Sequence, residues 1–141
     1  MAATYNNLYL DARKRLREAG VEGAQLEARE LVCCAAGKSR EQFYRDMALY
    51  ASDPVEEKLA ELLERRLAGE PVAYLIGEWE FYGLGLDITP DVLIPRMDTE
   101  VLAERAILLA RAAGEGARVL DLCAGSGCVG LAVAANVPGC R

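Results

Sequence analysis

The 141-residue sequence contains no histidine, and this absence excludes several kinds of site. A Ser–His or Cys–His couple needs an imidazole as its base, and many zinc sites need histidine ligands. We therefore expect neither nucleophilic catalysis of that kind nor a metal site in this chain.

Long apolar runs, a signal segment and paired cysteine motifs are also missing. No apolar run reaches the roughly 20 residues of a membrane-spanning helix, and the N-terminus lacks a charged stretch followed by an apolar one. The cysteines number five, an odd count, and none are spaced as Cys-x-x-Cys. These absences predict a reduced, cytoplasmic protein with no membrane partner.

Positive charge is scarce as well, because the formal net charge is −6. Nucleic-acid-binding domains usually carry a basic face, but the basic cluster Arg13–Arg17 is interleaved with acids. Asp11 pairs with Arg15, and Lys14 with Glu18, at the i,i+4 spacing of a helix. We interpret the cluster as a solvated helix face and expect no direct nucleic-acid partner.

Amphipathic helices dominate the first half of the chain, where apolar residues recur every three to four positions. Ser39 and Gln42 match a capping box, and Asp53-Pro54 followed by Glu56 matches an N-cap, a first-turn proline and a second box. Three of these segments are followed by glycines suited to helix ends. These features predict an all-α helical bundle over residues 1–73. The three glycines are Gly20, Gly37 and Gly69.

The pattern changes after Pro71. Aromatic and aliphatic residues alternate with glycines from Phe81 to Ile88, and Pro90 closes the run, which favours a β-hairpin. Ile94 precedes a proline and is therefore extended. We predict a β-hairpin connector over residues 74–96.

The rest of the chain, residues 97–141, predicts the first elements of an α/β domain. Asp98 or Thr99 can cap a helix, Arg118–Leu122 has the composition of a buried strand, and Cys128–Asn136 that of a second helix. The apolar positions of the first helix include Val101, Leu102, Ala106, Leu109 and Ala110.

The most informative segment, Val119–Gly130, joins that strand to the second helix through a glycine-rich turn. Glycines let the backbone approach a ligand closely, and a helix N-terminus presents free N–H donors. Gly125, Gly127 and Gly130 fit the G-x-G-x-x-G pattern of dinucleotide sites. By itself this pattern fits a nicotinamide enzyme, an S-adenosylmethionine site, or a turn that merely needs its glycines.

Asp121 separates the two cofactors, because it ends the strand four residues before Gly125. A carboxylate there would lie near the pyrophosphate of a dinucleotide, and like charges repel in a partly desolvated turn. S-adenosylmethionine has no phosphate and carries an ammonium and a sulfonium, so the sequence favours methyl transfer. A second acid usually holds the ribose about 20 residues further on. That count reaches Arg141, the last residue.

Three blocks together resemble the release-factor glutamine methyltransferase family over essentially the whole chain. The first is Arg65–Gly77, which reads RRLAGEPVAYLIG. The second joins Phe81–Leu84 to Leu93–Glu100, which reads LIPRMDTE, and it is the most specific. The third is Val119–Gly130.

The resemblance implies an activity, a cofactor and a partner. Members of the family transfer a methyl group from S-adenosylmethionine to the side-chain amide of the glutamine in the Gly-Gly-Gln motif of peptide chain release factors. They consist of an N-terminal helical bundle that helps to hold the protein substrate, a hairpin connector and a doubly wound, Rossmann-like catalytic domain.

Carried over by position, the resemblance also implies a cofactor site. Asp121 would support the cofactor loop, and Arg96, Asp98 and Thr99 would lie at the edge of the cofactor pocket. The loop itself would consist of Cys123, Ala124, Gly125, Ser126 and Gly127.

Two positions depart from the family's pattern. Met97 stands where proline is commoner, and Cys123 stands where glycine is commoner. The loss of a proline mainly loosens the turn. The cysteine matters if position 123 must adopt a positive φ, whereas a small side chain is tolerated in a turn with negative φ. Without a nearby histidine or lysine, we expect the Cys123 thiol to be inert.

The family's Asn-Pro-Pro-Tyr motif, which holds the glutamine amide, does not occur in this sequence. We therefore expect no catalytic residue in this chain and a truncated methyltransferase domain that is inactive by itself. The strand Arg118–Leu122 would then lack its parallel neighbours and could self-associate through its open edges. One alternative is a stand-alone helical module that binds a release factor without catalysis. The other, a fragment of a nicotinamide-dependent enzyme, is disfavoured by Asp121.

Overall fold

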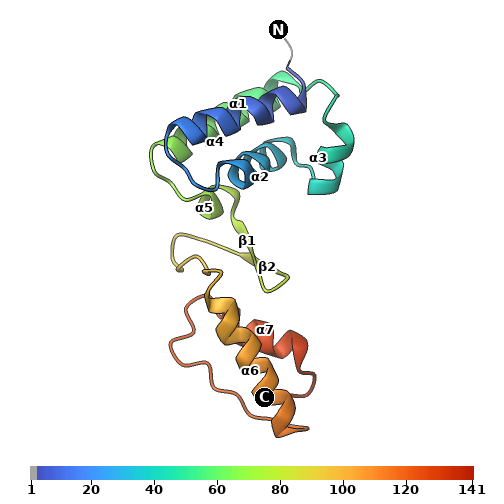
Figure 1. Ribbon diagram of the computed structural model, residues 1–141, viewed down its shortest axis with the longest axis vertical. Coiled ribbons are helices and arrows are strands. Elements are labelled where there is room, and N and C mark those ends of the chain that lie inside the picture. The colour runs from blue at the N-terminus through green and yellow to red at the C-terminus, as the bar shows by residue number, and fades with distance from the viewer. Residues whose placement is uncertain (1–2) are drawn as a thin grey trace. The chain divides into compact units, whose positions relative to one another are not determined.

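The computed structural model describes residues 3–141, which fold as two units, one ending at Ile76 and the other spanning Gly77–Arg141 (Figure 1). Within residues 3–76 the chain is helical, and the predicted all-α bundle is confirmed. The helices are α1 (Tyr5–Glu18), α2 (Ala24–Ala36), α3 (Arg40–Asp46), α4 (Asp53–Leu67) and α5 (Val72–Ile76).

Helix α2 lies at the centre of the first unit and contacts α1, α3, α4 and α5. Ala28, Leu31 and Val32 of this helix are completely buried. Adjacent residues point to different sides of a helix, so burial of both Leu31 and Val32 requires neighbours on more than one side. Gly37 ends α2 in the left-handed conformation, with a φ of 62°, as predicted.

Helix α3 begins with the predicted capping box, but the prediction for α4 was wrong by one residue. The Gln42 N–H donates to Ser39 Oγ over 3.2 Å, and the Ser39 N–H donates to Gln42 Oε1 over 2.9 Å. The N-cap of α4 is Ser52, and the cap makes no side-chain hydrogen bond. Glu56 instead accepts a hydrogen bond of 3.0 Å from the Ala3 N–H, which ties the start of the chain to α4.

The block that begins at Arg65 has a structural explanation. Arg65 donates two hydrogen bonds, of 2.9 and 2.8 Å, to the carboxylate of Glu70 across the turn after α4. Arg66 makes a bidentate pair with Glu27 of α2, and both side chains are mostly buried. Bidentate pairs fix geometry as well as adding energy, so these arginines set how α4 ends and how it packs on α2.

Asp46, at the end of α3, is buried between two cations. Arg45 Nε donates to Oδ1 over 2.9 Å, and Lys38 Nζ donates to Oδ2 over 2.7 Å. These hydrogen bonds hold the pKa of the Asp46 carboxyl well below its usual range. A carboxyl with a depressed folded-state pKa stabilises the fold above its unfolded pKa, and this contribution is lost as the pH falls through the folded pKa.

We expect Asp46→Asn to lower the Tm most above about pH 5, with the difference from wild type shrinking as the pH falls below about 4. Thermal unfolding between about pH 7 and about pH 2 measures this difference. Glu41→Gln is the matched control, because Glu41 is exposed on the same helix. If the effect of Asp46→Asn stays constant over the whole range, the ionised Asp46 does not stabilise the bundle.

The second unit contains the predicted hairpin, followed by two helices. Phe81 lies opposite Leu84, so a two-residue loop, Tyr82-Gly83, connects the antiparallel strands. Both loop residues have positive φ, 49° and 76°, as a type I′ turn requires. The elements are β1 (Glu78–Phe81), β2 (Leu84–Asp87), α6 (Thr99–Ala113) and α7 (Cys128–Asn136).

The hairpin is part of the core of the second unit. Phe81 is 1% exposed and forms a cluster, here the hairpin cluster, with Ala103 of α6 and with Cys128 and Ala132 of α7. Tyr82 packs against this cluster and also against a second one, here the helix cluster. An isolated hairpin is marginally stable, so its cover by α6 and α7 accounts for its formation. The helix cluster consists of Ile107, Ala110, Ala117, Val133 and Val137.

Tyr82→Asn is expected to destabilise the second unit by about 1–2 kcal/mol, although asparagine is the better type I′ residue. The reason is that the ring of Tyr82 contacts both clusters and asparagine would lose this packing. Urea unfolding followed by circular dichroism measures the change, and Tyr82→Phe, which keeps the ring, should stay close to wild type. A stabilised Tyr82→Asn variant would show that turn propensity outweighs packing here.

The segment Arg118–Leu122, predicted as a strand without its parallel neighbours, is not part of a sheet within residues 3–141, because no adjacent strand is present there. The segment belongs to no helix or sheet, Leu122 lies in a turn, and two apolar side chains face solvent: Leu120 is 83% exposed and Leu122 78% exposed. A strand is stabilised by its ladder of hydrogen bonds, and sequence composition alone does not supply one. Self-association through this segment stays a prediction.

One pair of hydrogen bonds nevertheless joins this segment to the last residue. The Arg141 N–H donates to the Ala117 carbonyl over 2.9 Å, and the Val119 N–H donates to the Arg141 carbonyl over 2.7 Å. Two bonds from one residue to the neighbours of Arg118 form one rung of a parallel ladder. Arg141 therefore lies beside Arg118 as a parallel strand would.

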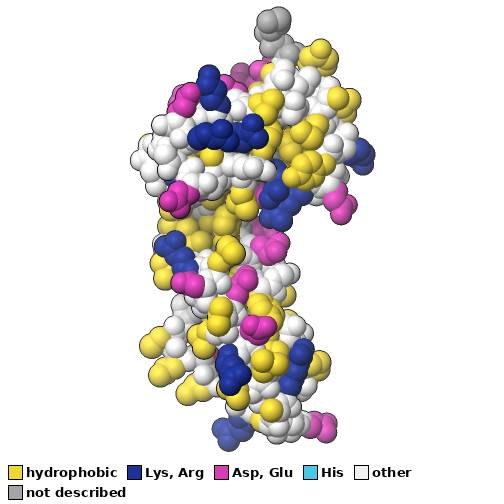
Figure 2. All heavy atoms as spheres, viewed as in Figure 1, with side chains coloured by type: hydrophobic (Ala, Val, Ile, Leu, Met, Phe, Trp, Pro, Cys, Tyr) yellow, Lys and Arg dark blue, Asp and Glu magenta, His cyan; other side chains and the backbone are white. Residues whose placement is uncertain are grey.

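Helix α6 has two apolar faces. Ala103 and Ile107 are buried within the second unit, whereas Val101, Leu102 and Leu109 are 68%, 59% and 61% exposed. Hydrophobic side chains are visible on the surface of this unit in Figure 2. Some of the apolar positions predicted for this helix are therefore exposed, because nothing within residues 3–141 packs on them.

Candidate functional site

The candidate site is the loop Cys123–Gly127, which leads from the segment Arg118–Leu122 into α7. Three of its residues, Cys123, Gly125 and Gly127, have positive φ angles of 58°, 59° and 78°. The Gly127 N–H donates to the Ala124 carbonyl over 2.8 Å and closes a tight turn inside the loop. The loop lies at the surface, with its first three residues exposed.

The carboxylate of Asp121 caps α7. Asp121 Oδ2 accepts a hydrogen bond of 3.0 Å from the N–H of Gly130, the third residue of that helix. Gly127, at the N-cap position, has no side chain that could make this bond. Asp121 therefore replaces the missing N-cap side chain of α7, although it lies in the segment before the loop. Its hydrogen bond to Gly130 closes the loop Cys123–Gly127.

Gly130 is required by this close approach. A Cβ atom on Gly130 would lie 2.9 Å from Asp121 Oδ2 and 3.5 Å from Asp121 Cβ. The third glycine of the pattern therefore serves contact between the helix and the preceding segment. By comparison, Gly125 has open space around the position of a Cβ and needs glycine for its positive φ.

The position of Asp121 bears on the kind of ligand that the loop can take. In dinucleotide sites the N-terminus of this helix binds the pyrophosphate through free N–H groups and the positive end of the helix dipole. Here the N–H of Gly130 is already bonded to a carboxylate. A pyrophosphate would face like charge at α7, whereas a cationic ligand would not.

Of the two cases left open for position 123, the structure has the one with positive φ, because the φ of Cys123 is 58°. Residues with a Cβ usually pay about 1 kcal/mol for the left-handed region. Glycine adopts this conformation without the penalty of a Cβ, so cysteine at position 123 adds backbone strain. The thiol is free and exposed.

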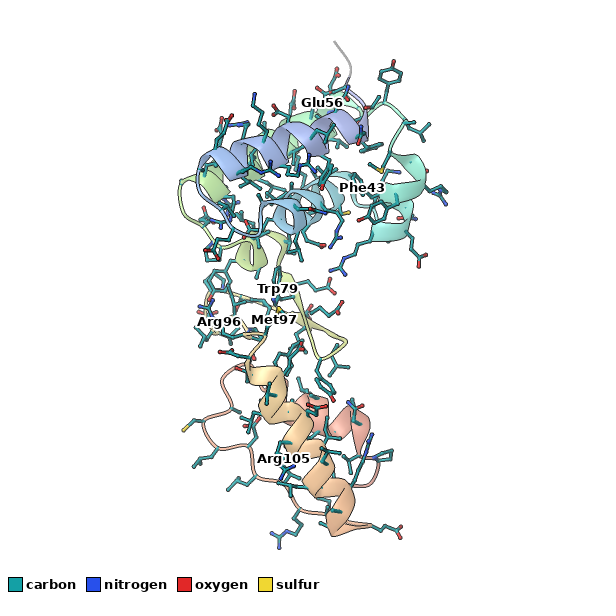
Figure 3. All side chains as sticks on the ribbon, in the orientation of Figure 1. Phe43, Glu56, Trp79, Arg96, Met97 and Arg105 are labelled. Atoms are coloured by element: carbon teal, nitrogen blue, oxygen red, sulfur yellow. The ribbon has the colours of Figure 1, made fainter. Side chains whose placement is uncertain are left out.

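Arg96, Asp98 and Thr99 lie on the segment that enters α6 (Figure 3, which labels Arg96). Asp98 is the N-cap of α6 without a side-chain hydrogen bond, and Thr99 is the first helical residue. Arg96 and Asp98 are exposed. Within residues 3–141 no hydrogen bond or ion pair joins these three residues to the loop, and their assignment to the cofactor site remains a proposal.

Sequence reasoning gave no role to Glu100. Glu100 Oε1 accepts a hydrogen bond of 2.8 Å from the backbone N–H of Tyr82, at the tip of the hairpin. The signal was present, because Glu100 belongs to the most specific of the three sequence blocks. Its partner could not be predicted, since the two residues lie 18 positions apart.

In residues 3–141 no helix is both long enough and apolar enough to cross a membrane. The same residues bring together no group of three or more histidine, cysteine, aspartate or glutamate side chains that could hold a metal ion.

Comparison with known proteins places the chain in a family. Residues 7–77 match the PrmC N-terminal domain, and this match covers half of the 141-residue chain. The chain belongs to the PrmC N-terminal domain family. The matched residues include α2 to α5 and most of α1, so this domain corresponds to the helical bundle of the first unit.

Curated relatives extend the similarity past the PrmC N-terminal domain. The release factor glutamine methyltransferase of Haemophilus influenzae is 41% identical over 120 residues, which cover 82% of this chain and 41% of that protein. That of Vibrio cholerae is 38% identical over 98% of this chain and 48% of its own length. That of Bordetella pertussis is 47% identical over 81% of this chain and 42% of its own length. The chain thus spans less than half the length of these relatives.

The Vibrio cholerae match covers the candidate site. A match over 98% of the chain leaves only a few residues outside it, so the loop Cys123–Gly127, Asp121 and Gly130 lie within the similar region. The similarity therefore includes both the PrmC N-terminal domain and the glycine loop that follows it.

Proposed function

We propose that this chain is the N-terminal part of a protein-(glutamine-N5) methyltransferase. The enzyme would transfer a methyl group from S-adenosylmethionine to the glutamine of the Gly-Gly-Gln motif in peptide chain release factors. The observation that carries this proposal is the similarity to release factor glutamine methyltransferases through the glycine loop. The five free cysteines support a reduced, cytoplasmic setting.

A Rossmann-like domain is part of the proposal. The parallel rung between Arg118 and Arg141, with α7 between them, is what a strand–helix–strand unit of a parallel sheet would begin with. The uncovered face of α6 and the exposed Leu120 and Leu122 are the apolar surface that further strands and helices would bury. The domains would be the bundle over residues 1–73, the connector over 74–96 and the start of the catalytic domain over 97–141.

The cofactor would be held at the loop Cys123–Gly127. S-adenosylmethionine supplies an electrophilic methyl group on a sulfonium. The loop offers exposed backbone next to the N-terminus of α7, and Asp121 fixes that backbone while contributing negative charge. The donor set suits a cationic ligand better than a phosphate. Arg96, Asp98 and Thr99 would border the pocket.

The PrmC N-terminal domain would help to hold the release factor. An amide nitrogen is a poor nucleophile because its lone pair is delocalised, so the enzyme's main task is to orient the amide toward the methyl group. A separate domain that grips the protein substrate serves this task. The competing candidate is a bundle that binds a release factor without catalysis. It predicts binding of the factor without methyl transfer.

Methyl transfer tests the proposal directly. The full-length protein of which this chain would be the N-terminal part, here the full-length enzyme, is incubated with methyl-labelled S-adenosylmethionine and a release factor. Label should enter the wild-type factor and should be absent from a factor in which the Gly-Gly-Gln glutamine is replaced by alanine. Binding of the factor without any label transfer would favour the stand-alone module.

We further expect the 141-residue chain alone to show no measurable affinity for S-adenosylmethionine. The loop is exposed, and the acid that would hold the ribose is expected about 20 residues after Asp121, at or beyond Arg141. Calorimetric titration of this chain measures the affinity, with the full-length enzyme as the positive control. A clear binding signal at submillimolar cofactor would show that the loop and α7 suffice.

A further inference from the structure

We propose that Glu100 is a positioning residue that fixes the tip of the hairpin to α6 and, through the hairpin, sets α7 and the glycine loop. The part of this proposal that concerns the cofactor rests on the proposed function. The part that concerns the hairpin rests on contacts among residues 81–132.

Glu100 contacts the loop of the hairpin. Glu100 lies in the first turn of α6, where the helix dipole favours a carboxylate. Its Oε1 accepts a hydrogen bond of 2.8 Å from the Tyr82 N–H, and both residues are half-buried. A hydrogen bond to an ionised group in such a setting is among the stronger ones in proteins.

Tyr82 adopts a backbone conformation that few side chains accept, with a φ of 49°. Residues persist in this region only when the surrounding structure over-determines them. Here the Glu100 carboxylate accepts a hydrogen bond from the backbone of Tyr82. The ring of Tyr82 packs on both the hairpin cluster and the helix cluster. Tyr82 therefore joins the two clusters of the second unit, and Glu100 anchors it.

The anchor reaches the candidate site through α7. Phe81, next to Tyr82, packs with Cys128 and Ala132 in the hairpin cluster. Cys128 is the first residue of α7 and directly follows Gly127, the last residue of the loop. The first turns of α7 are therefore held from two sides, by Asp121 at Gly130 and by the hairpin at Cys128. A loop held this way needs little reorganisation when it binds a ligand.

Glu104 provides a matched comparison. It lies one turn further along the same helix and is exposed, and no hydrogen bond or ion pair of its side chain occurs within residues 3–141. A solvated carboxylate on α6 should therefore behave as Glu104 does. If Glu100 is a positioning residue, its replacement must change the cofactor KM and the exchange rate of the Tyr82 amide, and a replacement that keeps an acceptor oxygen must change them less.

The test compares Glu100→Ala, Glu100→Gln and Glu104→Ala in the full-length enzyme. Two quantities are measured, the steady-state constants for S-adenosylmethionine and the hydrogen-exchange rate of the Tyr82 amide by NMR. Glu100→Ala should raise the KM for the cofactor about tenfold with kcat nearly unchanged, and should speed exchange at Tyr82 about tenfold or more. Glu100→Gln keeps an acceptor oxygen and should restore most of both, and Glu104→Ala should match wild type.

The outcomes separate this proposal from the proposed function. If the wild-type enzyme transfers no methyl group but Glu100→Ala still unprotects Tyr82, the function fails and the anchor stands. An unchanged Tyr82 exchange rate in Glu100→Ala, or a KM that rises equally in Glu104→Ala, overturns the anchor. If Glu100→Ala does not fold, Glu100→Asp withdraws the carboxylate by one methylene and should raise the KM in a folded protein; a wild-type KM in that variant also overturns the proposal.

Discussion

Gly130→Ala in the full-length enzyme is expected to abolish measurable binding of S-adenosylmethionine and to destabilise the second unit by about 2–4 kcal/mol. The added Cβ would lie 2.9 Å from Asp121 Oδ2, closer than real Cβ contacts come. Asp121 must then move away, which leaves the Gly130 N–H without its acceptor and releases the loop. Calorimetric titration with the cofactor and thermal unfolding measure the two effects.

A double-mutant cycle identifies the cause. In an Asp121→Ala background the contact is already gone, so Gly130→Ala should cost much less than in wild type. Gly23→Ala is the matched control, because Gly23 has a negative φ and only ordinary contacts around a Cβ. Equal costs of Gly130→Ala with and without Asp121 would mean that the helix simply disfavours a change there.

Phe43→Ala should destabilise the first unit by about 3–5 kcal/mol, a large part of the stability of a typical domain. Phe43 is 1% exposed and points from α3 toward α1 (Figure 3), where its ring meets that of Tyr9 edge-on with centroids 5.8 Å apart. Helix α3 has seven residues and depends on this packing more than on its own hydrogen bonds. Urea unfolding followed by circular dichroism measures the loss.

The neighbouring Tyr44 is the control for this cavity. Its ring also contacts Phe43, with centroids 5.4 Å apart, but the residue is 56% exposed. Tyr44→Ala should therefore cost less than about 1 kcal/mol. If the two variants lost similar free energies of unfolding, surface contacts of α3 would matter as much to stability as its packing in the core.

Local signals in the sequence predicted the first unit well. The capping box at Ser39 and the left-handed Gly37 depend on residues within a few positions of each other, and the structure confirms both. The shift of the α4 N-cap to Ser52 shows the limit of such signals, since Ser52 and Asp53 are both good caps. The sequence could not show which of the two would be the N-cap. It also could not show that Glu56, predicted to close a capping box, would accept a hydrogen bond from the Ala3 N–H.

The second unit was harder because its contacts are distant in sequence. The hairpin turn was predictable from alternation and glycines, but the bond from Tyr82 to Glu100 depends on how the hairpin packs. The strand Arg118–Leu122 was predicted from composition, yet a strand exists only with a neighbour, and Arg141 supplies one rung. Asp121 was singled out for its charge; its bond to Gly130 adds a helix cap that pattern alone could not show.

The most direct test of the central claim, that the loop beside Asp121 takes S-adenosylmethionine rather than a dinucleotide, is calorimetric titration of the full-length enzyme with both. We predict that S-adenosylmethionine binds at least about a hundredfold more tightly than NAD, a difference of about 2.7 kcal/mol. Tighter binding of NAD, or equal binding of the two, would contradict it.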